Sequence, residues 1–335
     1  MGGTRLELLG TPEIYKIMAD VTKQMKAMAI DQYGGPEALT LHTLPVPEVG
    51  ENEVLIRVEV AGVGVWDPME REGKLIMGET YFPRTLGAEG AGTIASVGGQ
   101  VTDFKEGDKV YGFGFQSPKG GFYAEYIVLL TNLVSRFPQK LSIEEAGALP
   151  VDGVTGLCGL EALQLSDGQK ILIWGASGGI GHLVVQLSKR LGAKVFAVAS
   201  GSDGVEFVQK LGADEAVDGK GGDVVAQARE FAPDGFDAAL ILAGGDEAQA
   251  ALETIKDGGA VAFPHGVAPE PKPRATIKVH AYSATPNPQI FERLNTLIEQ
   301  GPFEVAVART YPLEEAATAQ QDLKGHFLGK LALTV

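Results

Sequence analysis

One glycine-rich segment limits the possible folds of this chain more than any other feature: it reads Trp174-Gly175-Ala176-Ser177-Gly178-Gly179-Ile180-Gly181. It follows an apolar run at 170–174, and it precedes a stretch in which aliphatic residues recur at helical spacing. A strand that turns through glycines into a helix predicts the start of a parallel βαβ unit. Glycines let the backbone approach a ligand, and a helix N-terminus offers free N–H groups to an anion. The segment is therefore typical of a phosphate-binding turn.

The predicted ligand of this turn is the diphosphate of a dinucleotide. The turn has no Gly-Lys-Ser/Thr ending, which excludes a Walker-type ATP site. A glycine-rich turn without a ligand is the alternative interpretation. The residues expected around the diphosphate are Gly175, Ala176, Ser177, Gly178, Gly179, Ile180 and Gly181.

The end of the next strand predicts which dinucleotide binds. About 20 residues beyond the glycines, NAD sites usually carry an acid that accepts hydrogen bonds from the adenosine ribose. Here Ser200, Gly201 and Ser202 occupy that position, and their two hydroxyls could donate to a 2′-phosphate. This favours NADP(H). Asp203 is close and the strand end has no Arg or Lys, so a turn that tolerates either cofactor is the alternative.

The pattern of strands and helices divides the chain into three parts. Residues 141–284 alternate strand-like and helical stretches, which predicts a doubly wound, parallel Rossmann sheet. Residues 25–140 contain short strands between Gly and Pro turns, which favours a compact barrel. Residues 285–335 hold a helix and a last strand expected to pair with the barrel, so the Rossmann domain is an insertion. Residues 1–24 form an N-terminal extension, in which we expect a short amphipathic helix.

The charge and cysteine content exclude several classes of protein. The net charge is −15, and there is no Lys/Arg cluster to bind nucleic acid or an anionic membrane. Cys158 is the only cysteine, so neither an intrachain disulfide nor a cysteine-rich zinc site is possible. No apolar run reaches the ~18 residues of a membrane span, and no targeting peptide is apparent. We expect a cytoplasmic protein.

Six short motifs occur along the chain: the segments at 61–67, 86–92, 121–126 and 151–156, the glycine-rich turn, and Gly329-Lys330. In combination they resemble the medium-chain dehydrogenase/reductase superfamily, and most of all its zinc-free, zeta-crystallin-like NADPH:quinone oxidoreductases and enone reductases. The resemblance covers about Met25 to Val335, and it implies a GroES-like barrel that carries the Rossmann domain, NADP(H) as cofactor and a homodimer formed through the cofactor domain.

The resemblance also indicates that the catalytic zinc of the alcohol dehydrogenase branch is missing. That branch carries Cys, His and Cys where this chain has Gly64, Ala88 and Val151. Glu89 and Asp152 remain as possible oxygen ligands, but a catalytic zinc needs about three protein ligands. We therefore expect no metal.

Without a metal, hydride transfer is easiest to an acceptor that delocalises the resulting negative charge. We therefore predict an NADPH-dependent oxidoreductase that acts on a small-molecule quinone or an α,β-unsaturated carbonyl compound. An enoyl-thioester reductase, with Tyr81 as the only candidate proton donor, is one alternative. A non-catalytic NADPH-binding scaffold or sensor is another.

The remaining candidate residues are assigned by resemblance or by position. Ala243, His265 and Gly266 follow strands and are expected to border the nicotinamide half of the cofactor, with Thr155 and Lys330 near it. A helix-start hydroxyl is the alternative interpretation of Thr155. Asp67 matches an acid near the nicotinamide, but its spacing to Pro68 and Glu70 favours a helix N-cap. We identify no general acid. The predicted substrate pocket consists of Gly64, Trp66, Asp67, Tyr81, Phe113 and Tyr123.

Overall fold

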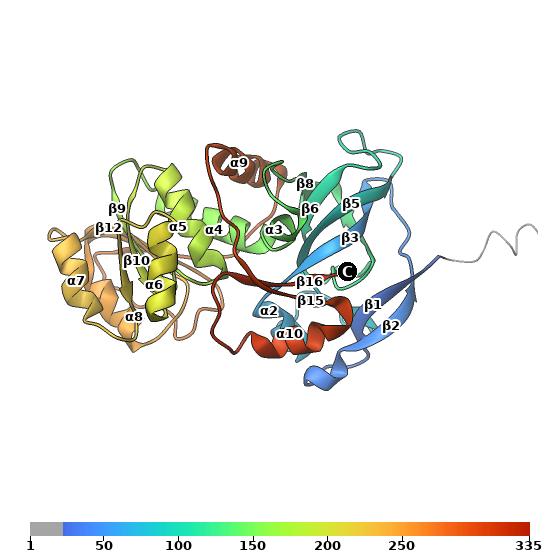
Figure 1. The fold of residues 1–335 in the computed structure, drawn as a ribbon, viewed down its shortest axis with the longest axis horizontal. Coiled ribbons are helices and arrows are strands. Elements are labelled where there is room, and N and C mark those ends of the chain that lie inside the picture. Colours follow the sequence, from blue (N-terminus) through green and yellow to red (C-terminus); the bar gives the residue numbers. More distant parts are fainter. Residues whose placement is uncertain (1–22) are drawn as a thin grey trace, which may run out of the picture.

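A computed structural model describes residues 23–335, which form two lobes. Figure 1 shows a parallel sheet flanked by helices in one lobe, and antiparallel strands in the other. The amphipathic helix predicted within residues 1–24 lies outside the described residues. No helix of the described part has both the length and the apolar character needed to cross a membrane.

The sheet of the first lobe has six parallel strands in the order β11-β10-β9-β12-β13-β14. The chain direction across the sheet reverses at β9, because β10 and β12 lie on its two sides. A crevice at the carboxyl ends of strands beside such a reversal is where doubly wound sheets bind ligands. The strands are β9 (Lys170–Trp174), β10 (Lys194–Ala199), β11 (Glu215–Asp218), β12 (Phe236–Ile241), β13 (Ile255–Pro264) and β14 (Lys278–Tyr282).

Helices connect these strands and cover the sheet, as the alternating pattern predicts (Figure 1). The first, α4, precedes the sheet and packs on both α5 and α9. The helices of this lobe are α4 (Pro150–Leu163), α5 (Gly179–Arg190), α6 (Gly201–Lys210), α7 (Val224–Phe231) and α8 (Asp246–Ala251). The fold class predicted from the sequence is confirmed.

The second lobe is built around β3 (Glu53–Val63), which pairs with β5, β7 and β16. Val54, Ile56, Val58 and Val60 of β3 are buried and alternate with more exposed residues, which explains its strand pattern. The other strands are β1 (Gln24–Ile30), β2 (Thr40–Pro45), β4 (Arg84–Thr85), β5 (Glu89–Val97), β6 (Lys109–Phe113), β7 (Tyr126–Leu130), β8 (Val134–Arg136), β15 (Val307–Pro312) and β16 (Lys330–Thr334).

The end of the chain returns to this lobe. Strand β16 pairs antiparallel with β3, with Leu333 opposite Ala61, as the sequence predicts. Just before β16, the N–H of Gly329 donates to the carbonyl of Ser177 over 3.0 Å, which joins the second lobe to the glycine-rich turn of the first. The remaining α-helices of the described residues lie outside the parallel sheet: α2 (Trp66–Arg71), α3 (Ile143–Gly147), α9 (Pro288–Glu299) and α10 (Ala316–Asp322).

One apolar core extends from the Rossmann sheet into the barrel by way of α4 and α9. Phe291 of α9 is fully buried in it. Its ring meets the ring of Tyr111 from β6 edge to face, with the ring centres 5.3 Å apart. The two lobes are therefore held together by the same kind of packing that stabilises each one.

We expect Phe291→Ala to lower the free energy of unfolding by about 3–5 kcal/mol, because it removes a buried ring and leaves a cavity where the lobes join. Urea-induced unfolding followed by circular dichroism would measure this loss. Leu130→Ala is the control, since Leu130 is 47% exposed and its truncation should change the free energy of unfolding by less than about 0.5 kcal/mol. Equal effects of the two substitutions would contradict the prediction.

Candidate functional site

A cleft of about 880 Å³ lies where the two lobes meet and brings most of the predicted site residues together. Its walls come from the glycine-rich turn, the ends of β10 and β12, the segment before α2 and the segment leading to β16. The predicted residues that line it are Gly64, Trp66, Gly175, Ser177, Gly178, Gly179, Ile180, Gly181, Ser200, Ala243 and Lys330.

The glycine-rich turn presents the N-terminus of α5 to this cleft. Helix α5 begins at Gly179, and no described side chain caps it, so its first N–H groups remain available to a ligand. Gly175 has φ +84°, which favours glycine. A Cβ on Gly181 would lie 2.1 Å from the carbonyl oxygen of Gly175, so only glycine fits there. The geometry is that of an anion-binding turn. Ala176 is buried behind it and does not line the cleft.

At one end of the cleft, positively charged and titratable side chains gather near Ser200. Lys220 follows β11, whereas Lys324 and His326 come from the segment that leads to β16. The imidazole Nε2 of His326 lies 2.8 Å from Oδ2 of Asp203, and this hydrogen bond lowers the pKa of the Asp203 carboxyl. Asp203, the acid that argued against a preference for NADP(H) in the sequence, is thus paired with a histidine.

Sequence reasoning missed Lys220, Lys324 and His326. They lie outside the βαβ unit in which a cofactor motif is sought, and only the return of the chain to the second lobe brings the last two to the cleft. Gly201 and Ser202, which were predicted here, belong to the first turn of α6 and do not line the cleft.

At the opposite end of the cleft, the buried ammonium of Lys330 holds two carboxylates. Its Nζ lies 2.5 Å from Oε1 of Glu89 and 2.9 Å from Oδ2 of Asp152, and 4.3 Å from the ring centre of Trp66. Burial alone would lower the pKa of Lys330, but the two carboxylates hold it above its usual value. Burial raises the pKa of Glu89 to about 7, against the opposing effect of Lys330.

These contacts also determine whether Glu89 and Asp152 are free to bind a metal ion. Glu89 and Asp152 are the two acids that could have supplied oxygen ligands, and both are bound to Lys330. Within residues 23–335, no group of three or more His, Cys, Asp or Glu side chains is arranged to hold a metal ion.

Asp67 does not cap a helix, so the predicted N-cap is wrong. Helix α2 begins one residue earlier, at Trp66, with Val65 at the N-cap position. The Asp67 carboxylate instead points inward, where its Oδ2 accepts hydrogen bonds from the Gly64 N–H over 2.7 Å and from the Tyr123 hydroxyl over 2.9 Å.

Several predicted residues do not line the cleft. Asp67, Phe113, Tyr123 and Thr155 are buried behind its walls. Their contacts with a ligand therefore stay predictions without geometric support.

Three other predicted residues, Tyr81, His265 and Gly266, do not line the cleft either. The Tyr81 hydroxyl donates to the carbonyl of Ser117, and the Arg84 guanidinium covers its ring, so Tyr81 is not placed as a proton donor for an enoyl thioester. His265 and Gly266 are exposed beyond β13, and His265 Nδ1 lies 3.1 Å from the Ser283 hydroxyl. Their roles also stay predictions.

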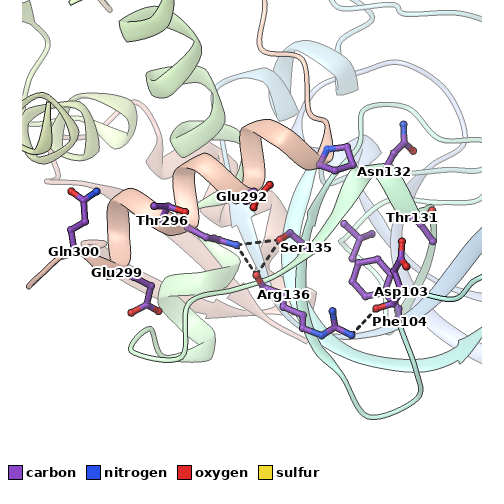
Figure 2. Close-up of a pocket in the computed structure, with 13 residues that line it drawn as sticks. Asp103, Phe104, Thr131, Asn132, Ser135, Arg136, Glu292, Thr296, Glu299 and Gln300 are labelled. Carbon is purple, nitrogen blue, oxygen red and sulfur yellow. Dashed lines mark hydrogen bonds between the residues drawn. The ribbon is translucent and has the colours of Figure 1, made fainter. Parts of the chain in front are cut away.

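A second hollow, of about 770 Å³, lies between α9 and β8 and contains none of the predicted site residues (Figure 2). Four of its lining residues bind one another. Arg136 donates to the carbonyl of Asp103 over 2.7 Å, and the Asn295 amide donates to the Ser135 hydroxyl over 3.2 Å. The cleft, which leaves a helix N-terminus and several cationic groups facing open space, is the stronger candidate site.

Comparison with known proteins identifies both lobes. Residues 50–139 match the family model described as alcohol dehydrogenase GroES-like domain, and residues 179–284 match the model described as zinc-binding dehydrogenase. A 2-methylene-furan-3-one reductase of Solanum lycopersicum is 34% identical, over 84% of this chain and 71% of the relative. The NADPH-dependent alkenal/one oxidoreductase of Arabidopsis thaliana is 32% identical, over 94% of this chain and 81% of the relative.

Quinone oxidoreductases match equally well along the chain. The Sus scrofa enzyme is 30% identical over 91% of this chain and 96% of its own length. The solved quinone oxidoreductase of Coxiella burnetii superposes with a TM-score of 0.81 at 29% identity, over 93% of this chain and all of the other. Together with the matches to both family models, these similarities show that the chain belongs to the medium-chain dehydrogenase/reductase superfamily, in the branch that holds quinone oxidoreductases and enone reductases.

Proposed function

We propose that this protein is an NADPH-dependent reductase that transfers hydride to quinones or α,β-unsaturated carbonyl compounds. The observation that carries the proposal is a single cleft with an anion-binding helix N-terminus at its centre and cationic side chains at one end. Relatives named quinone oxidoreductase and NADPH-dependent alkenal/one oxidoreductase support the same activity.

The residues of the cleft fit the parts of NADPH in order. The turn at 175–181 would hold the diphosphate with backbone N–H groups. Lys220, Lys324 and His326, with the hydroxyl of Ser200, would bind the 2′-phosphate, since they are the cationic and donor groups at that end. Gly64, Trp66 and Lys330 would surround the nicotinamide. The bound cofactor would supply the hydride.

The acceptor would lie beside Trp66, whose ring meets that of Phe115 edge to face. We propose that no zinc takes part, because Gly64, Ala88 and Val151 replace the metal ligands of zinc relatives and Lys330 binds the two remaining acids. The protein would then orient the acceptor, and the acceptor itself would delocalise the negative charge. Solvent would supply the proton.

We also propose that the protein is a cytoplasmic homodimer. Strand β14 forms an edge of the parallel sheet, and Val279 in this strand is 49% exposed. An edge strand has unpaired backbone N–H and C=O groups along its free side, which favours pairing with a strand of another chain. Most homo-oligomers are dimers with two-fold symmetry.

The cofactor preference can be tested at the cationic end of the cleft. We expect the double variant Lys220→Gln/Lys324→Gln to lower kcat/KM for NADPH about 10- to 100-fold, because each lysine would form a charge-assisted bond to the 2′-phosphate. The value for NADH should change little. Lys210→Gln is the matched control, since Lys210 lies on the same lobe but outside the cleft. A parallel loss with both cofactors would argue against 2′-phosphate recognition at this end.

Independence from zinc can be tested by removing metals. Prolonged dialysis against a chelator should leave quinone and enone reduction unchanged, because the described residues offer no set of three ligands for a metal ion. Elemental analysis of the purified protein should find less than stoichiometric zinc. One zinc per chain, lost together with the activity, would refute the proposed chemistry.

Light scattering on a size-exclusion column would determine the oligomeric state. We expect the mass of two chains for the wild type. Val279→Lys should shift the equilibrium toward the monomer, because it places a charge on the exposed edge strand. A wild-type monomer at micromolar concentration would rule out the proposed dimer.

A further inference from the structure

Buried acids outnumber buried bases at the end of the cleft formed by Gly64 and Trp66. Asp67, Glu89 and Asp152 are all buried there, and Lys330 is the cation they adjoin. We propose that the Asp67 carboxylate stabilises the positive charge that the nicotinamide ring carries after hydride has left it. Asp67 would thus make the bound cofactor a stronger hydride donor without touching it. The inference rests on the proposed function, because it requires the nicotinamide at this end.

The position of Asp67 supports this role. Its Oδ2 accepts a hydrogen bond from the N–H of Gly64, and Gly64 itself lines the cleft. The carboxylate therefore lies directly behind a backbone segment of the cleft wall. Its other oxygen, Oδ1, is buried and has no hydrogen-bond partner among the described residues. Such a group is shielded from water, so its charge is felt across the wall.

The cations nearest to Asp67 are already engaged. Lys330 is bound by Glu89 and Asp152. Of two nearby arginines, Arg71 binds Glu72 at 2.9 Å and Gln320 at 2.7 Å, and Arg84 donates to the carbonyl of Glu79 over 2.9 Å and lies 3.6 Å from Glu70. The uncharged Tyr123 hydroxyl is the side chain that donates to Asp67.

The charge balance follows from these pairs. The side chains that act on Asp67 are Lys330 of β16, the Tyr123 hydroxyl and, on its own helix α2, Glu70. Lys330 binds Glu89 and Asp152, so its single positive charge is already matched, and the Asp67 carboxylate is left with a neutral hydroxyl as its side-chain donor. A carboxylate in this position favours a cation in the cleft.

Hydride transfer is the step in which the charge of Asp67 would act. Hydride transfer moves two electrons and one hydrogen nucleus to the acceptor, leaves the ring with one positive charge, and gives the acceptor one negative charge that a solvent proton neutralises. A carboxylate fixed behind the wall before the step favours the oxidised, cationic form without rearrangement. Burial raises the pKa of Asp67 to about 6, so the group is mostly ionised at neutral pH.

Binding measurements test the inference without turnover. Trp66 and Trp174 are the two tryptophans of the chain, and both line the cleft, so quenching of their fluorescence reports cofactor binding. We expect Asp67→Asn to raise the ratio Kd(NADP+)/Kd(NADPH) about tenfold, as loss of one buried charge behind the wall of the cleft predicts. The two cofactors carry the same phosphates, so effects on phosphate binding cancel in this ratio.

The wild type gives a second test that needs no variant. Above a pH of about 6, Asp67 is ionised and favours NADP+, and below it the protonated group does not. The ratio Kd(NADP+)/Kd(NADPH) should therefore rise as the pH is lowered from about 8 to about 5. Glu89 titrates in the same range, because burial raises its pKa to about 7, so the part of the rise that is missing from Asp67→Asn is the part due to Asp67.

Glu70→Gln is the matched control, since it replaces another buried carboxyl on the same helix, next to Arg84. Burial raises the pKa of Glu70 to about 8, so its replacement removes little charge at neutral pH and should leave the ratio unchanged. An equal ratio in wild type and Asp67→Asn, together with a flat pH profile, would overturn the inference while leaving the proposed function intact. If neither protein bound NADPH, the proposed function itself would fail.

Discussion

The ion pairs of Lys330 link the parts of the molecule that form the cleft. Glu89 comes from the barrel, Asp152 from the first turn of α4, and Lys330 from the last strand. Removing one partner of such a buried pair costs about 3–5 kcal/mol, because a charge is left without compensation. The backbone makes room for the cluster: a Cβ on Gly62 would lie 2.7 Å from Glu89 Oε1, and one on Gly179 would lie 2.3 Å from Asp152 Oδ2. Gly179 thus begins helix α5, whose N-terminus faces the cleft, and also leaves room for the Asp152 carboxylate.

The two ends of the cleft differ in charge, and this gives the proposed cofactor a direction. Lys220 and Lys324 lie at one end, beside the His326–Asp203 pair, although the chain as a whole has a net charge of −15. The buried acids lie at the other end. A dinucleotide with a phosphate on its adenosine and a ring that becomes cationic is bound favourably in one orientation, with the phosphate at the lysines. The reverse orientation would place like charges together at both ends.

Local sequence patterns predicted the architecture. The site residues that these patterns did not predict depend on contacts between segments that are distant in the sequence. The glycine-rich turn, the strands at 170–174 and 194–199 and the return of the last strand could be read from the sequence, because periodicity and turn residues act over a few positions. Asp67 was misread since its spacing to Pro68 fits a cap, and only the fold brings Tyr123 within hydrogen-bonding distance. Lys324 and His326 lie in a segment without a motif, and no local signal connects them to Ser200. Aromatic residues such as Phe113 were assigned to a pocket but pack in the core.

The buried acids also bear on which acceptors such a site can reduce. When hydride adds to an isolated carbonyl, the negative charge develops on the oxygen bonded to the carbon that receives it, close to the nicotinamide. In a zinc relative the metal would neutralise that oxygen. Here Lys330 is already bound to Glu89 and Asp152, so its positive charge is not free to stabilise an oxyanion at this place. In a quinone or an enone, conjugation moves the charge to an oxygen several bonds away from the reacting carbon. The arrangement that favours a cationic ring therefore disfavours simple carbonyls and selects conjugated acceptors, which joins the proposed role of Asp67 to the proposed substrates.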